Sequence, residues 1–147
     1  MATAAPPQDY KNHRKFVPAF HYVAVPILLV NVIYSGYVAA TSFALGSVIA
    51  LLVAIALLIV AFLARIFALG AQDRVIRLEE RLRLHEVLPP DQQHNIDKLT
   101  TGQLVGLRFA SDGEVAALVA TVTAEGIEDR DEIKKRVTNW RADNQRL

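Results

Sequence analysis

The chain has 147 residues, of which 52% are hydrophobic and 21% charged, with 16 Lys and Arg against 15 Asp and Glu. This composition and a mean hydropathy of +0.26 favour a small membrane protein with a polar extension over a soluble domain. The near balance of charge gives no support for a nucleic-acid partner. The absence of cysteine excludes disulfides, thiolate metal sites and thiol nucleophiles.

Residues 22–64 contain no Asp, Glu, Lys, Arg or His. A helix crosses the hydrocarbon core of a bilayer with about 20 residues, so this stretch is long enough for two spans. Small residues and Gly46 interrupt it between positions 40 and 47 and can form a tight turn, with Ser47 as N-cap of the second helix. We therefore expect a transmembrane helical hairpin over residues 18–69, with helices near 18–40 and 47–69.

Basic residues flank both outer ends of this hairpin and are absent from its turn. They are Lys11, Arg14 and Lys15 before it, and Arg65, Arg74 and Arg77 after it. The positive-inside rule then predicts that both termini are cytoplasmic. A cleaved signal peptide ending near residue 40 is the weaker alternative, because the apolar run starts late and contains Asn31.

Asn31 lies near the middle of the first predicted span, where an unpaired amide costs on the order of one to several kcal/mol. It must bond within its own helix, to Tyr34 or Ser35, or to a partner subunit, a second copy or a cofactor. Small residues at helical spacing predict close packing, either within the hairpin or against a partner. These candidate interface residues are Gly36 and Ala40 on the first helix, and Ala50, Ala54 and Ala61 on the second.

Strong helix formers continue the second helix beyond the apolar stretch, so a cytoplasmic stalk is expected over residues 70–88, ended by two prolines. The pairs Asp73/Arg77 and Glu79/Arg83 are spaced to support this helix. An apolar stripe is predicted to pack on the C-terminal segment, with dimerisation as the alternative. The stripe residues are Val75, Leu78 and Leu82, continued loosely by Val87 and Leu88.

A basic face of the stalk is the candidate site for a soluble partner. It consists of Arg74, Arg77 and Arg81. Trp140, which falls in the last predicted helix, is a further candidate interface residue.

Residues 89–147 contain three helix-start signals. Thr100, Ser111 and Asp129 each precede Gln or Glu by three positions, as in a capping box. They predict helices at 101–109, 112–125 and 130–144, with Gly126 ending the middle one and a short helix at 91–99. Few apolar residues are available, so this small domain needs the stalk or another protein to complete its core. The expected core residues are Ile96, Leu99, Leu104, Leu107, Phe109, Val115, Leu118, Val119, Val122, Ile127, Ile133, Val137 and Trp140.

The chain contains none of the HExxH, GxGxxG, P-loop or GxSxG motifs. His21, at the edge of the first span, is a weak candidate ligand for a metal or tetrapyrrole, and a polar interface residue is the simpler interpretation. We expect no enzymatic activity, no cofactor, no metal site and no small-molecule substrate.

Short motifs are spread over nearly the whole chain. They are Tyr10-Lys11-Asn12-His13, Gln72-Asp73-Arg74-Val75-Ile76-Arg77-Leu78-Glu79, Arg81-Leu82-Arg83, Leu88-Pro89-Pro90, Leu104-Val105-Gly106-Leu107-Arg108-Phe109-Ala110-Ser111-Asp112, and Ile133-Lys134-Lys135 with Trp140. With the hairpin, this set resembles an uncharacterised family of small bacterial two-span membrane proteins, a domain of unknown function. The resemblance implies the bacterial inner membrane and supplies no activity.

The sequence thus predicts an all-α protein with four parts. They are an N-terminal tail at 1–17, the hairpin at 18–69, the stalk at 70–88 and a small helical cytoplasmic domain at 89–147. The leading hypothesis is a non-catalytic accessory subunit of a larger membrane complex, of respiratory or photosynthetic type, whose partners are the lipid bilayer and other membrane subunits. The alternatives are a membrane-tethered adaptor for a soluble protein and an oligomeric transporter or channel component.

Overall fold

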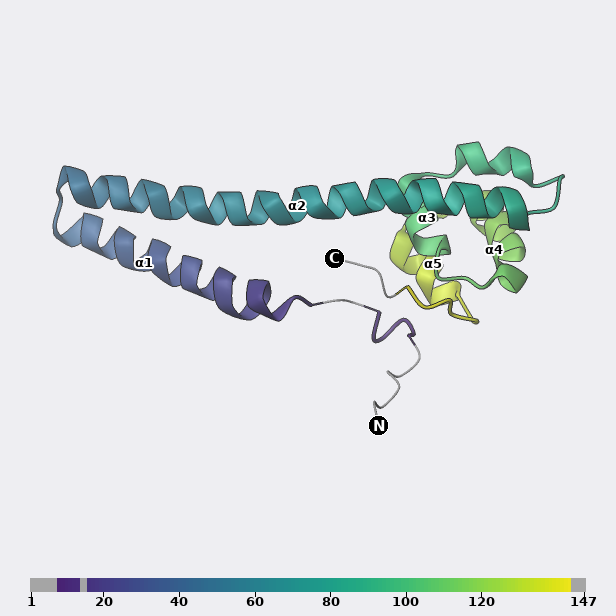
Figure 1. The fold of residues 1–147 in the computed structure, drawn as a ribbon, viewed down its shortest axis with the longest axis horizontal. Coiled ribbons are helices and arrows are strands. Elements are labelled where there is room, and N and C mark those ends of the chain that lie inside the picture. The colour runs from purple at the N-terminus through teal and green to yellow at the C-terminus, as the bar shows by residue number, and fades with distance from the viewer. Residues whose placement is uncertain (1–7, 14–15, 144–147) are drawn as a thin grey trace. The chain divides into compact units, whose positions relative to one another are not determined.

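The computed structural model describes residues 8–13 and 16–143, which form helices and no strand (Figure 1). This confirms the all-α prediction. The helices, in chain order, are η1 (Ala19–Ala24, a π-helix), α1 (Val25–Thr41), α2 (Leu45–Val87), η2 (Gln93–Lys98, a 3₁₀-helix), α3 (Thr101–Leu107), α4 (Asp112–Glu125) and α5 (Arg130–Arg136). They belong to two compact units: an apolar unit of residues 16–70, and a C-terminal unit of residues 71–143 together with residues 8–13.

Two helices of the chain are long and apolar enough to cross a membrane, by length and composition. They are Ala19–Thr41, with 23 residues, and Leu45–Val87, with 43. Pro26 stands in the second position of α1, and the turn before it is the π-helix η1. Because proline has no N–H and its ring crowds the carbonyl four residues earlier, a wider turn accommodates it without ending the helix.

The start of α2 corrects one prediction, because the helix begins at Leu45 and Ser47 is not its N-cap. Ser47 is the third helical residue. Its hydroxyl accepts a hydrogen bond from the backbone N–H of Ala44 at 3.0 Å. Ser47 therefore makes one of the two hydrogen bonds of a capping box, the one in which the third helical residue binds the backbone N–H of the N-cap residue. This bond holds the connection at residues 42–44.

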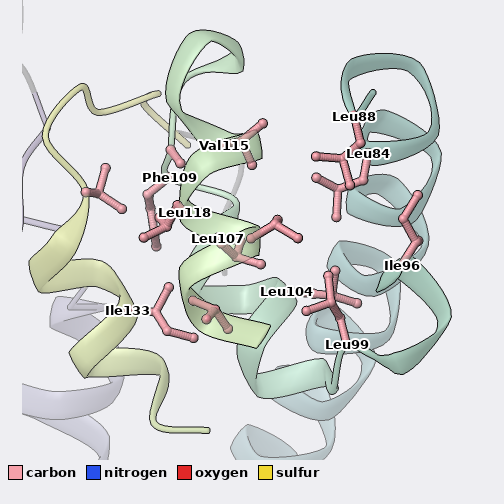
Figure 2. Packing of buried hydrophobic residues seen from close by; sticks show 14 of the residues in the cluster. Leu84, Leu88, Ile96, Leu99, Leu104, Leu107, Phe109, Val115, Leu118 and Ile133 are labelled. Atoms are coloured by element: carbon pink, nitrogen blue, oxygen red, sulfur yellow. The ribbon is translucent and has the colours of Figure 1, made fainter. Parts of the chain in front are cut away.

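The helix α2 continues without a break through Gly70 to Val87, which confirms that the second helix extends beyond the apolar stretch. The face that packs on the C-terminal helices, however, includes only the end of the predicted stripe, Val87 and Leu88. Leu84 and Leu88 are buried and point into the core cluster (Figure 2), whereas Leu78 and Leu82 are 61% and 59% exposed. Residues 76, 80, 84 and 88 follow one another at a spacing of four, so they line one side of the helix.

The core of the C-terminal unit contains every apolar residue expected from the sequence, with Trp140 half-buried at its edge. On α4, the buried residues recur at positions 115, 118, 119 and 122, the spacing of a helix with one buried face. Gly126 ends α4 with φ +63°, a conformation that favours glycine. The additional members of the cluster are Leu84, Leu88 and Ala110.

The predicted caps have three different outcomes. Thr100 and Gln103 form a complete capping box on α3, as expected. Ser111 makes no side-chain cap, and the Glu114 carboxylate that would complete a capping box instead accepts hydrogen bonds from the backbone N–H groups of Thr138 and Asn139. Asp129 caps α5 by accepting from Asp131 N–H, without a matching contact from the Glu three residues later.

The last helix is shorter than predicted, because α5 ends at Arg136 instead of near residue 144. Val137 has extended backbone angles, and the chain then passes alongside the segment after α3. There Ala110 and Trp140 form an antiparallel bridge, and Arg141 N–H donates to Phe109 O at 2.7 Å. Glu114 and this bridge bind the backbone groups that a longer helix would have used internally.

Candidate functional site

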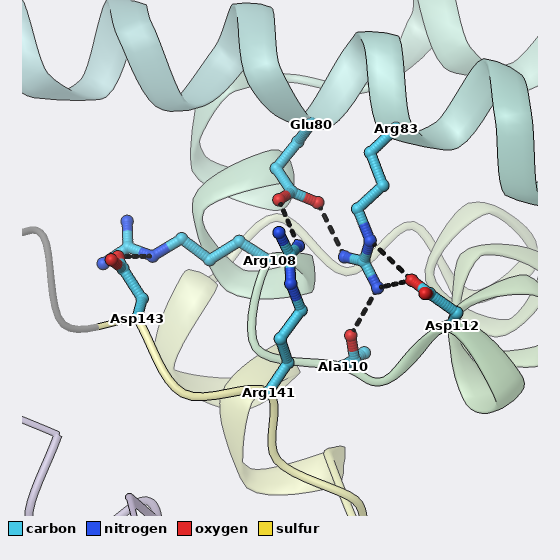
Figure 3. Close-up of polar contacts among 7 residues, drawn as sticks. All are labelled: Glu80, Arg83, Arg108, Ala110, Asp112, Arg141 and Asp143. Atoms are coloured by element: carbon cyan, nitrogen blue, oxygen red, sulfur yellow. Dashed lines mark hydrogen bonds and ion pairs between the residues drawn. The ribbon is translucent and has the colours of Figure 1, made fainter.

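A buried carboxylate on α2 is the centre of a polar cluster in the C-terminal unit (Figure 3). Glu80 is 4% exposed, and its two oxygens serve different arginines. Oε2 accepts a hydrogen bond from Arg83 Nη1 at 2.8 Å, and Oε1 accepts one from Arg141 Nη1 at 3.0 Å. A buried carboxylate without such partners would be strongly unfavourable, so these contacts must form as the unit folds.

The guanidinium of Arg83 extends this cluster from α2 to Ala110, which precedes α4, and to the first residue of α4. Its Nε donates to Asp112 Oδ1 at 2.8 Å, and its Nη2 donates to the backbone oxygen of Ala110 at 2.7 Å. One planar cation therefore binds Glu80, Asp112 and a main-chain carbonyl together. The expected pairing of Glu79 with Arg83 is wrong, because Arg83 faces the core side of the helix.

A second buried arginine holds Asp143, and Asp143 in turn joins the two ends of the described chain. Arg108 is 7% exposed; its Nε lies 3.1 Å from Asp143 Oδ2 and its guanidinium carbon 4.5 Å from the centre of the Phe109 ring. The backbone N–H of Asp143 donates to Gln8 Oε1 at 2.8 Å. Residues 8–13 of the N-terminal segment are thus part of the C-terminal unit.

His13 is the most buried residue of that N-terminal segment, at 5% exposure. Its ring lies 5.7 Å from the ring of Phe109 and 5.8 Å from that of Trp140. Nδ1–H donates to Tyr10 O at 2.6 Å, and Nε2 accepts from Lys134 Nζ at 3.5 Å. The contact with the Tyr10 carbonyl oxygen assigns a proton to Nδ1 and leaves Nε2 facing the Lys134 ammonium.

The chemistry of these polar groups is that of ion pairs that stabilise the C-terminal unit. Within the described residues, no group of three or more His, Asp or Glu side chains could hold a metal ion. The pairs Arg108–Asp143 and Arg141–Glu80 instead join segments that are distant in sequence, whereas Glu80–Arg83 and Lys134–Asp131 each lie within one helix. Removing one partner would leave a buried charge, which is what makes such pairs specify a single arrangement.

Arg136 shows the same pairing at the surface of this unit. It donates to Glu125 at 2.6 Å and to Glu132 at 3.0 Å. The hydrogen bond to Glu125 raises the pKa of Arg136 above its ordinary value, although desolvation acts in the opposite direction. This contact joins the C-terminal end of α4 to α5.

The apolar unit presents most of its hydrophobic side chains outward. In the apolar 18-residue stretch of each long helix, only 6% of the stretch is buried inside the structure. The core helix of a soluble protein would instead be mostly buried. The exceptions are Ser35 on α1 and Ala54 on α2, at 8% and 0% exposure. A Cβ added to Gly36 would lie 3.9 Å from Leu51 Cδ1, so small residues accompany the approach of the two helices here.

Asn31 is exposed on α1. Neither Tyr34 nor Ser35 hydrogen-bonds its side chain, and the amide has no partner elsewhere in residues 8–13 and 16–143. The interpretation that Asn31 is satisfied inside the chain is therefore not supported. An amide so placed, near the middle of Ala19–Thr41, is available to a group outside this chain.

The other predicted interface residues are scattered over both units. Ala40 and Ala50 are exposed, Ala61 is half-buried, and Arg74 and Arg77 are exposed. Arg81 is half-buried, with Nη2 at 3.5 Å from the Asp97 carbonyl oxygen. Trp140 belongs to the core edge, where Nε1 donates to Val137 O at 3.2 Å.

His21, the weak ligand candidate, has Nδ1 at 2.9 Å from Val17 O and lies edge-on to two phenylalanine rings. Its hydrogen bond is to its own helical turn. The residues that sequence reasoning missed are His13, Glu80, Arg83 and Arg108. For Glu80 a signal was present, because it stands four residues from both Ile76 and Leu84 on the row that proved to be buried.

The described chain is therefore an all-helical protein with two helices long and apolar enough to cross a membrane and a compact helical unit stabilised by buried ion pairs. It belongs to DUF6526, a family of unknown function that matches residues 3–147. This match confirms the resemblance to an uncharacterised family. Comparisons with curated proteins and with solved structures found no match.

Proposed function

We propose that this chain is a non-catalytic accessory subunit of a larger membrane protein complex in the bacterial inner membrane. Helices Ala19–Thr41 and Leu45–Val87 would cross the bilayer as an antiparallel hairpin, joined by the short connection at residues 42–44. The positions of the basic residues favour a cytoplasmic location for the C-terminal unit. The outward-facing apolar side chains support the membrane part of the proposal, because in water so large an exposed apolar surface would cause aggregation.

The observation that carries the subunit role is the exposed carboxamide of Asn31. In a hydrocarbon environment, an unpaired amide costs about 1–3 kcal/mol. Lipid tails offer it no partner, and neither do the described residues of this chain. A hydrogen-bonding group on a neighbouring membrane helix would remove this cost and would specify how that helix docks.

The test is extraction of the full chain in mild detergent, blue-native separation and mass spectrometry of the band that contains it. Wild type is compared with Asn31→Leu, which removes the amide, and with Ile33→Leu, an apolar change at a neighbouring residue that is 72% exposed. The proposal expects a large assembly of fixed stoichiometry for wild type and Ile33→Leu, and loss of this chain from it for Asn31→Leu. Equal recovery of the assembly with Asn31→Leu would contradict the role of the amide, and migration of wild type without other subunits would contradict the subunit role.

A membrane-tethered adaptor is the second candidate, supported by the exposed guanidinium groups of Arg74 and Arg77. The support is narrower than the sequence suggested, because Arg81 and Trp140 contact their own chain. Arg77→Glu should release a soluble acidic partner in a pull-down if this function is correct. An unchanged pull-down would count against it.

A further inference from the structure

In the membrane-distal part of α2, the first three residues of the apolar stripe are left uncovered by the residues that the structure describes. Val75, Leu78 and Leu82 are 54%, 61% and 59% exposed. The C-terminal helices pack on the other side of the helix, where Leu84 and Leu88 are buried. Charged residues surround the stripe, so it is not suited to the hydrocarbon core of a membrane.

The spacing of the stripe is that of a coiled-coil seam. Steps of three and four residues lead from Val75 to Leu78 and Leu82, so they occupy positions a, d and a of a heptad. The intramolecular contacts at residues 76, 80 and 84 fall at b, f and c, away from the seam.

Charges beside the stripe identify what can cover it. With Val75 at a, positions g are Arg74 and Arg81, and positions e are Glu79 and Glu86. In a parallel pair of identical helices, each g residue faces the e residue five positions later on the other copy, so arginine meets glutamate at every such contact. In an antiparallel pair, g would face g and e would face e, and like charges would repel. The surface is therefore complementary to itself in one orientation.

These flanking charges are also available. Arg74, Glu79 and Glu86 have no ion pair to any part of the chain that the structure describes, unlike Asp73, whose carboxylate lies 3.9 Å from Arg130. Arg81 makes one long contact, 3.5 Å from Nη2 to the Asp97 carbonyl oxygen. Rotation of the Arg81 side chain would replace this contact with one to a carboxylate of the covering partner.

We propose that a second copy of this chain covers the stripe, forming a parallel two-helix pairing in which Val75, Leu78 and Leu82 meet their counterparts. Arg74 then faces Glu79 of the other copy, and Arg81 faces Glu86. This self-association does not depend on the proposed membership of a larger complex. Two copies inserted with the same orientation in one membrane would present their α2 helices parallel, as the charges require.

Because the chain has no cysteine, a single introduced thiol reports the pairing directly. Leu78→Cys is placed on the seam, and Arg77→Cys serves as the matched control, since it is exposed and adjacent but points away from the seam at position c. Both full-length variants are oxidised in membranes with copper phenanthroline and separated without reductant. A band of two chains with Leu78→Cys, and at most a trace with Arg77→Cys, is the expected result.

Charge exchange tests the partner and the orientation. Glu79→Arg with Glu86→Arg makes the flanks entirely basic, and Arg74→Glu with Arg81→Glu makes them entirely acidic. Each version, carrying Leu78→Cys, should cross-link roughly tenfold less than the wild-type flanks, because attractions become repulsions. Co-expression of the two versions should restore a mixed cross-link.

Three outcomes would overturn the proposal. One is a Leu78→Cys cross-link no stronger than that of Arg77→Cys. Another is a cross-link that ignores both charge reversals. The third is a thiol adduct in which mass spectrometry finds a different protein in place of the second copy. Resistance of the C-terminal unit to trypsin, compared between each variant and the Arg77→Cys control, shows that the variant is folded.

Discussion

The guanidinium of Arg141 lies 3.0 Å from Oε1 of Glu80, joining two residues that are 61 positions apart in the sequence. Glu80 belongs to the long helix α2, and Arg141 follows the end of α5. The contact therefore closes the C-terminal unit around its core, together with the hydrogen bond from Arg83 to the other carboxylate oxygen. It also explains why an acidic residue occupies the buried row of α2.

We predict that Glu80→Ala lowers the free energy of unfolding of the C-terminal unit by about 3 kcal/mol, because Arg83 is left inside the unit with one partner fewer. Urea unfolding of the full chain in detergent measures this, with fluorescence of Trp140, the chain's single tryptophan, as the signal. Glu128→Ala is the control, since its side chain is exposed and should change stability by less than about 0.5 kcal/mol. Equal midpoints for the two variants would contradict the role of Glu80.

The N-terminal segment should contribute to the stability of the C-terminal unit. His13→Ala removes ring contacts with Phe109 and Trp140 and the acceptor for Lys134, so we expect a loss of about 1–2 kcal/mol. The urea midpoint of Trp140 fluorescence reports it. Lys11→Ala, at an exposed position of the same segment, should leave the midpoint unchanged. If His13→Ala does likewise, the segment does not pack on this unit.

Gly106 is required by the close approach of α3 and α5. A Cβ at this position would lie 2.9 Å from Ile133 Cβ and 3.1 Å from the backbone oxygen of Arg130, neither of which is a flexible chain end. Gly106→Ala should therefore cost about 1–3 kcal/mol despite the better helix propensity of alanine. In Gly113→Ala the new methyl meets nothing within 4 Å, and thermal unfolding should show a slight gain. A neutral Gly106→Ala would refute the close packing.

The two neighbouring N-caps should respond differently to the same change. Thr100→Ala removes the hydroxyl that accepts from Gln103 N–H, and we expect a loss of about 1 kcal/mol. Ser111→Ala removes a hydroxyl that caps nothing, so its effect should stay below about 0.5 kcal/mol. Circular dichroism during urea unfolding compares them. Equal losses would mean that Ser111 caps α4 in solution.

Local signals in the sequence predicted local structure well. The complete capping box at Thr100 and the glycine that ends α4 depend on contacts within a few residues, and both are as expected. The uninterrupted helix past Gly70 likewise follows from helix-forming residues alone. The capping box predicted at Ser111 did not form, and its Glu114 carboxylate accepts from the backbone N–H groups of Thr138 and Asn139, distant partners that no local pattern can reveal.

The sequence by itself determined that the chain is helical, that two helices are apolar enough to span a membrane, and which residues between Ile96 and Val137 form the core. These properties depend on composition and on helical periodicity, which are readable along the chain. Only the tertiary structure decided which side of α2 is buried. Both sides carry apolar residues at helical spacing, and the Leu84 side is the buried one. Glu80 on that side is paired with Arg83, one turn further along α2, and with Arg141, which only the folded chain brings close.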